Sequence, residues 1–341
     1  MHGSIVRRLF VVAIFVGGLW GTAVAASLPE SPQGQWQLLR EIPLPGQATR
    51  FDYMSLDPSA NRLYLAHLGD GCLVVFDTKN MRVIASLPGF PHVHGVLVVP
   101  ELHRVYATVS PLSKRRKGTL VVVNSRTLHT VAKTSVGIHP DGLDYEPSSG
   151  RVFVSNEWGG SLSVVDAVRE RENGTIPLGG EVGNTRVDPV THRVWATVQT
   201  QNLLVGVDPK TLKVVRRIPL PCRHPHGLLI RGKRHLALVA CENDDSLLGV
   251  DLVTGKTLFR STTGRRPDVL SDDPSRHLLF VASESGVVDV YRLGDRFKKL
   301  SERFLGFRVH SVLVDPRRSF LYVPFENIKG RPILRIYAWK M

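Results

Sequence analysis

The sequence predicts an all-β protein, a seven-bladed β-propeller, on three observations. First, a segment of about 43 residues recurs seven times along the 341-residue chain. Second, each copy holds four short apolar runs with a period of two residues, separated by turn residues, and no helical segment. Third, the last copy stops after its third run, and a matching fourth run lies near the N-terminus. Four-stranded units at this spacing form propeller blades.

The second strand of each repeat has the most regular sequence. Its core starts at Arg62, Arg104, Arg151, Arg193, His235, His277 and Ser319. Turn pairs such as Asp57-Pro58, Asp188-Pro189 and Asp315-Pro316 precede it. Proline and aspartate favour tight turns, so the first two strands of each blade are expected to form a hairpin.

The two ends of the chain are expected to share a blade. The seventh repeat ends with a third strand at residues 333–339, while residues 35–42 carry the fourth-strand pattern. Pairing them closes the ring and removes two exposed sheet edges. The sequence therefore predicts one propeller domain over residues 34–341, preceded by a linker at 26–33.

Residues 1–25 have the features of a secretory signal peptide. Arg7 and Arg8 precede an apolar run at 9–20, and Ala23-Val24-Ala25 forms a cleavage site. This run is short for a membrane span and no later run approaches 18 apolar residues, so we expect no integral membrane span after cleavage and a periplasmic or secreted protein. Cleavage lowers the net charge from +14 to +12, because the segment holds two arginines and no acid. An uncleaved N-terminal anchor is the alternative.

These repeats resemble the YVTN-type propellers, including the exported YncE-like proteins, over nearly all of the chain after the leader. The resemblance implies the propeller fold. It implies no particular ligand or partner, because propellers host many unrelated activities.

Polar residues occur at three corresponding positions in the blades. At the start of strand one, the first-strand column is Asp52, His94, Asp141, Gly183, His226, Asp268 and His310. Two residues earlier, the preceding column is Arg50, His92, His139, Glu181, His224, Arg266 and Arg308. At the end of strand two, the second-strand column is Leu68, Ser110, Glu157, Gln199, Glu242, Glu284 and Glu326. Residues i and i+2 share a strand face, so all three columns are expected at one mouth of the central channel, on what we name the top face.

This composition suits two kinds of ligand. Imidazoles beside carboxylates favour a divalent transition metal, and the candidate ligands are His92, His94, His139, His224, His226 and His310. Arginines from neighbouring blades suit a carboxylate or phosphate, and the candidates for a small anionic ligand are Arg50, Asp52, Asp141, Glu181, Arg266, Asp268, Arg308, Glu284 and Glu326. The structural alternative is a network in which these charges only neutralise one another.

Three functions follow as hypotheses. The first is an exported protein that binds a divalent metal or small anionic ligand at the top mouth. The second is a metal-dependent lactonase or lyase at the same site, in which His226 or Glu242 moves a proton. We find no P-loop, G-x-S-x-G, H-E-x-x-H or dinucleotide motif that would indicate another enzyme class.

The third hypothesis is a scaffold that binds nucleic acid, anionic lipid or a cell-wall polymer. It rests on basic residues in the turns of the opposite, bottom face, including Lys79, Arg126, Lys210, Lys233, Lys256 and Arg317. The alternative is that repeated turns carry lysine and arginine for solubility.

Three cysteines exclude a cysteine-rich module and a Cys₄ zinc fold. Cys222 and Cys241 both fall on the top face of blade 5, where an oxidising compartment favours a disulfide between them. Metal ligation by Cys222 is the alternative. Cys72 lies in a third strand and is expected to be a buried thiol.

Overall fold

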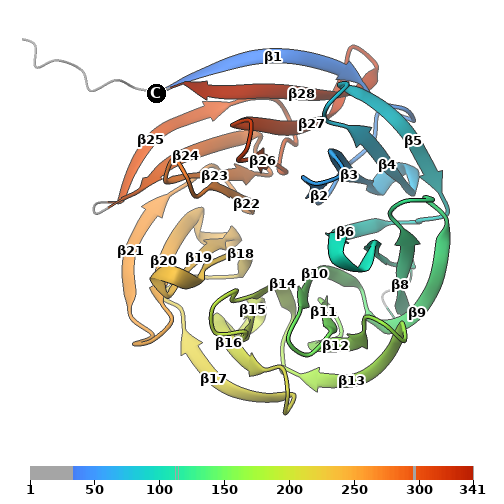
Figure 1. The fold of residues 1–341 in the computed structure, drawn as a ribbon. Helices are drawn as coiled ribbons and strands as arrows, with labels where there is room; N and C mark the ends of the chain where they lie inside the picture. The colour runs from blue at the N-terminus through green and yellow to red at the C-terminus, as the bar shows by residue number, and fades with distance from the viewer. Residues whose placement is uncertain (1–33, 112, 114, 295–296, 341) are drawn as a thin grey trace, which may run out of the picture. The chain divides into compact units, whose positions relative to one another are not determined.

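The inner edge of the protein is a ring of first strands, with the other three strands of each blade outside it (Figure 1). The computed structural model describes residues 34–111, 113, 115–294 and 297–340. These residues form seven four-stranded antiparallel sheets, so the predicted seven-bladed β-propeller is confirmed. The predicted signal peptide at 1–25 and linker at 26–33 lie outside the described residues.

Blades 1 to 6 run from the innermost to the outermost strand in chain order. Blades 1 to 3 contain β2 (Met54–Asp57), β3 (Arg62–His67), β4 (Cys72–Asp77), β5 (Arg82–Pro88), β6 (Val93–Val99), β7 (Arg104–Val109), β8 (Lys117–Asn124), β9 (Thr130–Ile138), β10 (Pro140–Glu146), β11 (Arg151–Asn156), β12 (Ser161–Asp166) and β13 (Arg171–Pro177). Blades 4 to 6 contain β14 (Val182–Val187), β15 (Val194–Val198), β16 (Leu203–Asp208), β17 (Lys213–Pro219), β18 (Pro225–Arg231), β19 (Leu236–Cys241), β20 (Ser246–Asp251), β21 (Thr257–Thr262), β22 (Pro267–Asp273), β23 (Leu278–Ser283), β24 (Val287–Leu293) and β25 (Phe297–Phe304).

Blade 7 joins the two ends of the chain, as the repeat pattern predicted. It contains β26 (Leu313–Asp315), β27 (Phe320–Ile328), β28 (Arg331–Lys340) and, as its outer strand, β1 (Gln35–Pro43). The strands β1 and β28 lie side by side on the rim in Figure 1, with Trp36 opposite Trp339 in the register. The rings of these two tryptophans meet edge to face at 5.4 Å. The pairing therefore combines backbone hydrogen bonds with an aromatic contact.

The hydrophobic core fills the spaces between neighbouring blades. Strand β3 is buried over nearly its whole length, whereas the outer strand β5 alternates between exposed and partly buried residues. One core cluster joins Tyr64 of blade 1 to Val105 and Val121 of blade 2. Each blade thus stabilises the next, which fixes the positions of the inner strands around the channel.

The strand-only repeat prediction missed short helical turns. Within the described residues, five 3-10 helices of three residues lie in the loops between strands: η1 (Leu68–Asp70), η2 (Pro100–Leu102), η3 (Gln199–Gln201), η4 (Gly232–Arg234) and η5 (Glu242–Asp244). Runs this short carry no helical periodicity that a sequence pattern could show. In the described part of the chain, no helix is long and apolar enough to cross a membrane.

Candidate functional site at the channel mouth

In blades 2 to 6 the first-strand column lies at a break in the inner strand, whereas in blades 1 and 7 Asp52 and His310 precede that strand. In blade 2, Val93 pairs with Val109, and the register then shifts before Val96, so His94 falls within the irregular segment. Blades 3, 5 and 6 have similar shifts after Pro140, Pro225 and Pro267. A bulge of this kind redirects side chains, and here it places the polar ones toward the channel mouth.

The preceding column also departs from the expected strand geometry. Five of its members have positive φ angles of 48–57°: His92, His139, His224, Arg266 and Arg308. These residues lie in the turn before the strand, so the i, i+2 argument for a shared strand face was wrong. The turn nevertheless brings the column to the mouth, because its carbonyls accept hydrogen bonds from the second-strand column. The Glu157 N–H donates to the His139 carbonyl at 2.9 Å, and the Glu242 N–H to the His224 carbonyl at 3.0 Å.

Asp52 belongs to a ring of buried acids and imidazoles around the channel mouth, which we name the inner ring. Its Oδ2 atom is 2.8 Å from Nδ1 of His94, and its Oδ1 atom is 3.7 Å from Nε2 of His310. The partners come from blades 2 and 7, on either side of blade 1. Asp52 therefore connects three blades through one carboxylate.

His226 has the corresponding position on the opposite side of the ring. Its Nε2 atom lies 3.4 Å from Oδ1 of Asp268 and 3.6 Å from Oδ2 of Asp141. The Tyr53 hydroxyl reaches the same nitrogen at 3.2 Å and accepts a 2.7 Å hydrogen bond from the Asn184 amide. The inner ring is thus a connected network whose members come from most of the blades.

An outer tier of glutamates lies above this ring. Each of four glutamates has a basic partner: His139 with Glu157 at 3.2 Å, His224 with Glu242 at 3.3 Å, Arg50 with Glu284 at 2.8 Å and Arg308 with Glu326 at 3.4 Å. Arg266 also approaches Glu242 at 3.6 Å, and Glu181 lies 4.0 Å from His224. The arginines are therefore already paired with carboxylates and do not form an isolated cationic cluster.

The two tiers enclose a mouth cavity of about 400 Å³. It is lined by Arg50, Asp52, Tyr53, Leu68, His94, His139, Asp141, Glu157, His224, His226, Glu242, Arg266, Asp268 and Glu284. The predicted site residues His92, Glu181, Arg308, His310 and Glu326 are not among these lining residues. The repeat pattern does not distinguish His92 from His94, and of these two histidines only His94 lines the cavity.

The density of acids shifts the pKa values of the inner ring. Burial raises the pKa of Asp141 to about 7 and that of Asp268 to about 6. Burial alone would lower the pKa of His226, but the surrounding carboxylates, above all Asp268, raise it to about 10. Burial opposes ionisation of Asp52 too, yet its interactions with His310 and His94 hold its pKa well below the usual range.

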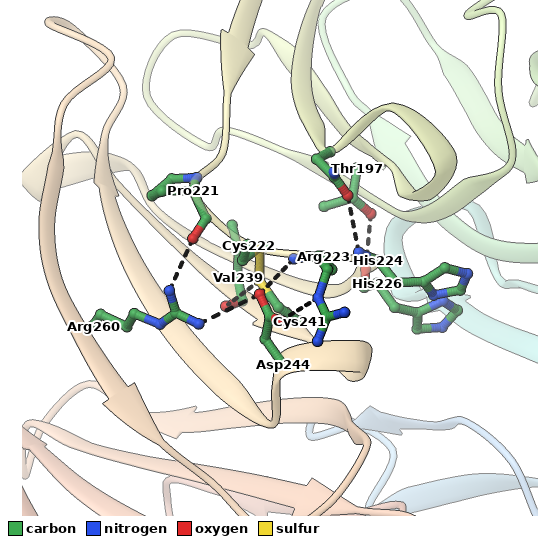
Figure 2. The surroundings of a disulfide bond; sticks show 11 residues. Thr197, Pro221, Cys222, Arg223, His224, His226, Val239, Cys241, Asp244 and Arg260 are labelled. Carbon is green, nitrogen blue, oxygen red and sulfur yellow. Dashed lines mark hydrogen bonds and ion pairs between the residues drawn. A yellow bond between two sulfur atoms is a disulfide. The ribbon is translucent and has the colours of Figure 1, made fainter.

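A disulfide supports the blade-5 part of the site. Cys222 and Cys241 are bonded, with a Cα–Cα distance of 6.2 Å, so the alternative of Cys222 as a metal ligand is wrong. Figure 2 shows the imidazoles of His224 and His226 extending away from this bond. The same loop is held by Arg223, which donates to Asp244, while the Thr197 hydroxyl donates to the His226 carbonyl. The covalent link therefore fixes the loop that presents two histidines.

Tyr53, Asn184 and Trp158 are residues of the site that were not predicted from the sequence. The column after the first-strand column is Tyr53, Gly95, Gly142, Asn184, Gly227, Val269 and Ser311. Small residues prevail there because inner strands approach closely, and a Cβ on Gly95 would collide with the Asp141 carbonyl. Tyr53 is the one bulky aromatic residue in this column, and that exception could have marked it as a site residue. Trp158 stacks on His139, with ring centroids 3.6 Å apart.

Compared with models of protein families and with curated proteins, the chain matches none. The structure thus shows the propeller fold, while the resemblance to YVTN-type and YncE-like propellers rests on the repeat residues alone.

Proposed function

We propose that the mouth cavity binds a divalent transition-metal ion and presents it to a small anionic ligand. The observation that carries this proposal is a group of three donors from three blades. One donor atom from each of Asp52, His94 and Asp141 lies within 4.8 Å of the others. All three residues line the cavity, so an ion held by them would be accessible to a ligand. Mixed imidazole and carboxylate donors suit zinc, manganese, iron or cobalt.

The charge balance of the cavity also favours a cation. Its lining contains six carboxylates beside two arginines and four histidines. Burial raises the pKa of Asp141 to about 7, which means that ionising this carboxyl is unfavourable unless more positive charge is nearby. A divalent ion would supply that charge to several carboxylates at once.

A second donor group shares Asp52 and supports the same location. One atom from each of Asp52, Asp268 and His310 lies within 4.8 Å of the others, and all three residues are buried. Nδ1 of His310 donates to the Arg308 carbonyl at 3.1 Å, while Nε2 has no hydrogen-bond partner among the described residues. Metal-binding imidazoles are commonly oriented in this way, with one nitrogen fixed and the other directed at the ion.

The rim provides donors for the anionic ligand. Arg266 is 62% exposed and lines the cavity, and Arg50 beside it is 34% exposed. Both guanidinium groups could turn toward a carboxylate or phosphate while keeping contact with their glutamates. A volume of about 400 Å³ suits a small molecule and not a folded partner.

The lactonase or lyase hypothesis ranks second because its proton-transfer groups have unfavourable pKa values. The carboxylates around His226 raise its pKa to about 10. Burial alone would raise the pKa of Glu242, but His224, His226 and Arg266 lower it to about 2. A general acid or base works best near the ambient pH, so neither group is suited to this role. Polyanion binding by the bottom face stays a prediction.

The matched pair His94→Ala and His92→Ala tests metal binding at the mouth. Zinc, manganese and cobalt are titrated by calorimetry into mature protein stripped of metal and carrying no histidine tag. We expect His94→Ala to weaken binding by about tenfold to a thousandfold, because one of few donors is lost. We expect His92→Ala to bind like the wild type, because His92 does not line the cavity.

Equal affinities in wild type and His94→Ala would contradict the proposal, as would failure of all three metals to bind. Circular dichroism of both variants checks that the blades remain folded. Titrating citrate or phosphate into the metal-loaded and metal-free proteins then tests the anionic ligand. Anion binding that requires the metal is the expected result.

A further inference from the structure

The turn between β3 and β4 carries a separate group of metal-ligand side chains in blade 1, which we name the blade-1 cluster. It consists of His67, Asp70 and Cys72, and one donor atom from each lies within 4.8 Å of the others. None of the three is among the described residues that line the mouth cavity. The cluster is therefore independent of the site proposed above.

The hydrogen bonds of Thr49 determine which nitrogen of His67 carries the proton. The Thr49 hydroxyl donates its one hydrogen to Oδ1 of Asp70, at 3.1 Å. It lies 3.0 Å from Nε2 of His67, so it must accept a hydrogen from that nitrogen. In the neutral imidazole, Nδ1 then carries a lone pair and no hydrogen.

That nitrogen is buried and lies near a carboxylate oxygen. His67 is 0% exposed, and its Nδ1 atom makes no hydrogen bond within the described residues. The nearest acid oxygen is Oδ2 of Asp70, 3.8 Å away. Two unprotonated acceptors this close, one buried and one half-buried, repel unless a cation lies between them.

The surroundings hold these side chains in place. The Phe51 ring stacks on the His67 imidazole, with centroids 4.0 Å apart. The Gln47 N–H donates to Oδ2 of Asp70 at 2.7 Å, which ties the loop after β1 to the cluster. Gly46 has a φ of +96°, and a Cβ there would collide with the Asp70 carboxylate. Glycine at this position thus permits the loop to cover the cluster closely.

We propose that His67, Asp70 and Cys72 form a second metal site, for a zinc-type divalent ion. Zinc bonds of about 2.0–2.3 Å place tetrahedral ligand atoms roughly 3.3–3.7 Å apart, so the cluster needs only small side-chain movements to close. The Nε2–H of His67 donates to a hydroxyl, which is the usual outer contact of a ligating histidine. Such an ion would brace the turn between β3 and β4, which the loop after β1 contacts through the hydrogen bond from Gln47 to Asp70.

Metal binding must displace the thiol proton of Cys72. Burial raises the pKa of this thiol, so it is protonated in the metal-free protein. Binding of the ion then forms the metal–sulfur bond and releases one proton to solvent. The disulfide between Cys222 and Cys241 leaves Cys72 as the only free thiol, so a metal–thiolate signal can come from no other residue.

Cobalt(II) tests the proposal, because a cobalt–thiolate bond gives a charge-transfer absorption band in the near ultraviolet. Nitrogen and oxygen ligands at the mouth give no such band. We expect the metal-stripped wild type to develop the band on adding cobalt, and Cys72→Ser to lose it together with about one bound cobalt per chain. The matched control His94→Ala is expected to keep the band, whether or not the mouth binds metal.

Thiol reactivity gives a second test that needs no variant. In the wild-type protein, bound zinc is expected to slow alkylation of Cys72, because the ligated sulfur no longer attacks the reagent. Absence of the cobalt band would overturn the proposal, and so would an unchanged alkylation rate with excess zinc. A band that disappears in His94→Ala and persists in Cys72→Ser would equally overturn it.

Discussion

Replacing Asp52 with alanine is expected to abolish metal binding at the mouth and to lower the free energy of unfolding by about 3–5 kcal/mol. Asp52 belongs to both donor groups of the inner ring. It is also buried between His94 and His310, whose ring nitrogens lie 2.8 Å and 3.7 Å from its carboxylate oxygens. Without Asp52, the two buried imidazoles and the Arg50 guanidinium lose a carboxylate that all three share as a neighbour. Urea unfolding and zinc titration of the same preparation measure the two effects.

The variant Asp52→Asn separates charge from packing. The amide keeps the shape of the side chain and can accept one hydrogen bond, so the loss of stability is expected to be smaller than with alanine. Metal binding is expected to be lost in both variants, because a neutral amide is a poor ligand for transition metals. An Asp52→Ala protein that binds zinc as tightly as wild type would exclude Asp52 as a ligand.

Replacing Trp339 with alanine is expected to cost about 3–5 kcal/mol of stability. Trp339 is buried and contacts Trp36 of the closing strand β1 and Phe280 of blade 6. The substitution leaves a large cavity where the two ends of the chain meet. Urea unfolding followed by tryptophan fluorescence measures the loss, and limited proteolysis shows whether β1 detaches first.

Leu38→Ala is the matched control for this prediction. Leu38 lies in the same strand pair, opposite Tyr337, but is 46% exposed. We expect a loss below about 1 kcal/mol, because little apolar surface is buried there. Similar losses in the two variants would mean that the aromatic contact does not hold the ring closed.

The fold could be predicted because the same hydrophobic pattern is repeated in every blade. Seven copies of a four-strand pattern determine the number of blades. The seventh copy ends with its third strand, β28, so its missing fourth strand was predicted to be β1. Short 3-10 turns such as η1 escaped this reasoning, since three residues have no period. The repeat also placed Cys222 and Cys241 on one face of blade 5. Whether they form a disulfide depends on the local geometry, which the structure provides.

The site was only partly predictable. Repeat positions correctly place Asp52, His94 and Asp141 around one cavity. They do not distinguish His94 from His92, because the difference arises from a bulge and a positive φ angle that no sequence period encodes. The blade-1 cluster breaks the repeat altogether, so a comparison of columns could not find it.

Anomalous scattering from crystals grown with cobalt would test the metal site most directly. We expect a strong peak at the channel mouth, within bonding distance of donor atoms of Asp52, His94 and Asp141. His92→Ala crystals should keep this peak, and His94→Ala crystals should lose it. Well-ordered crystals of the wild type with no peak between these residues would contradict the claim that the mouth binds a metal ion.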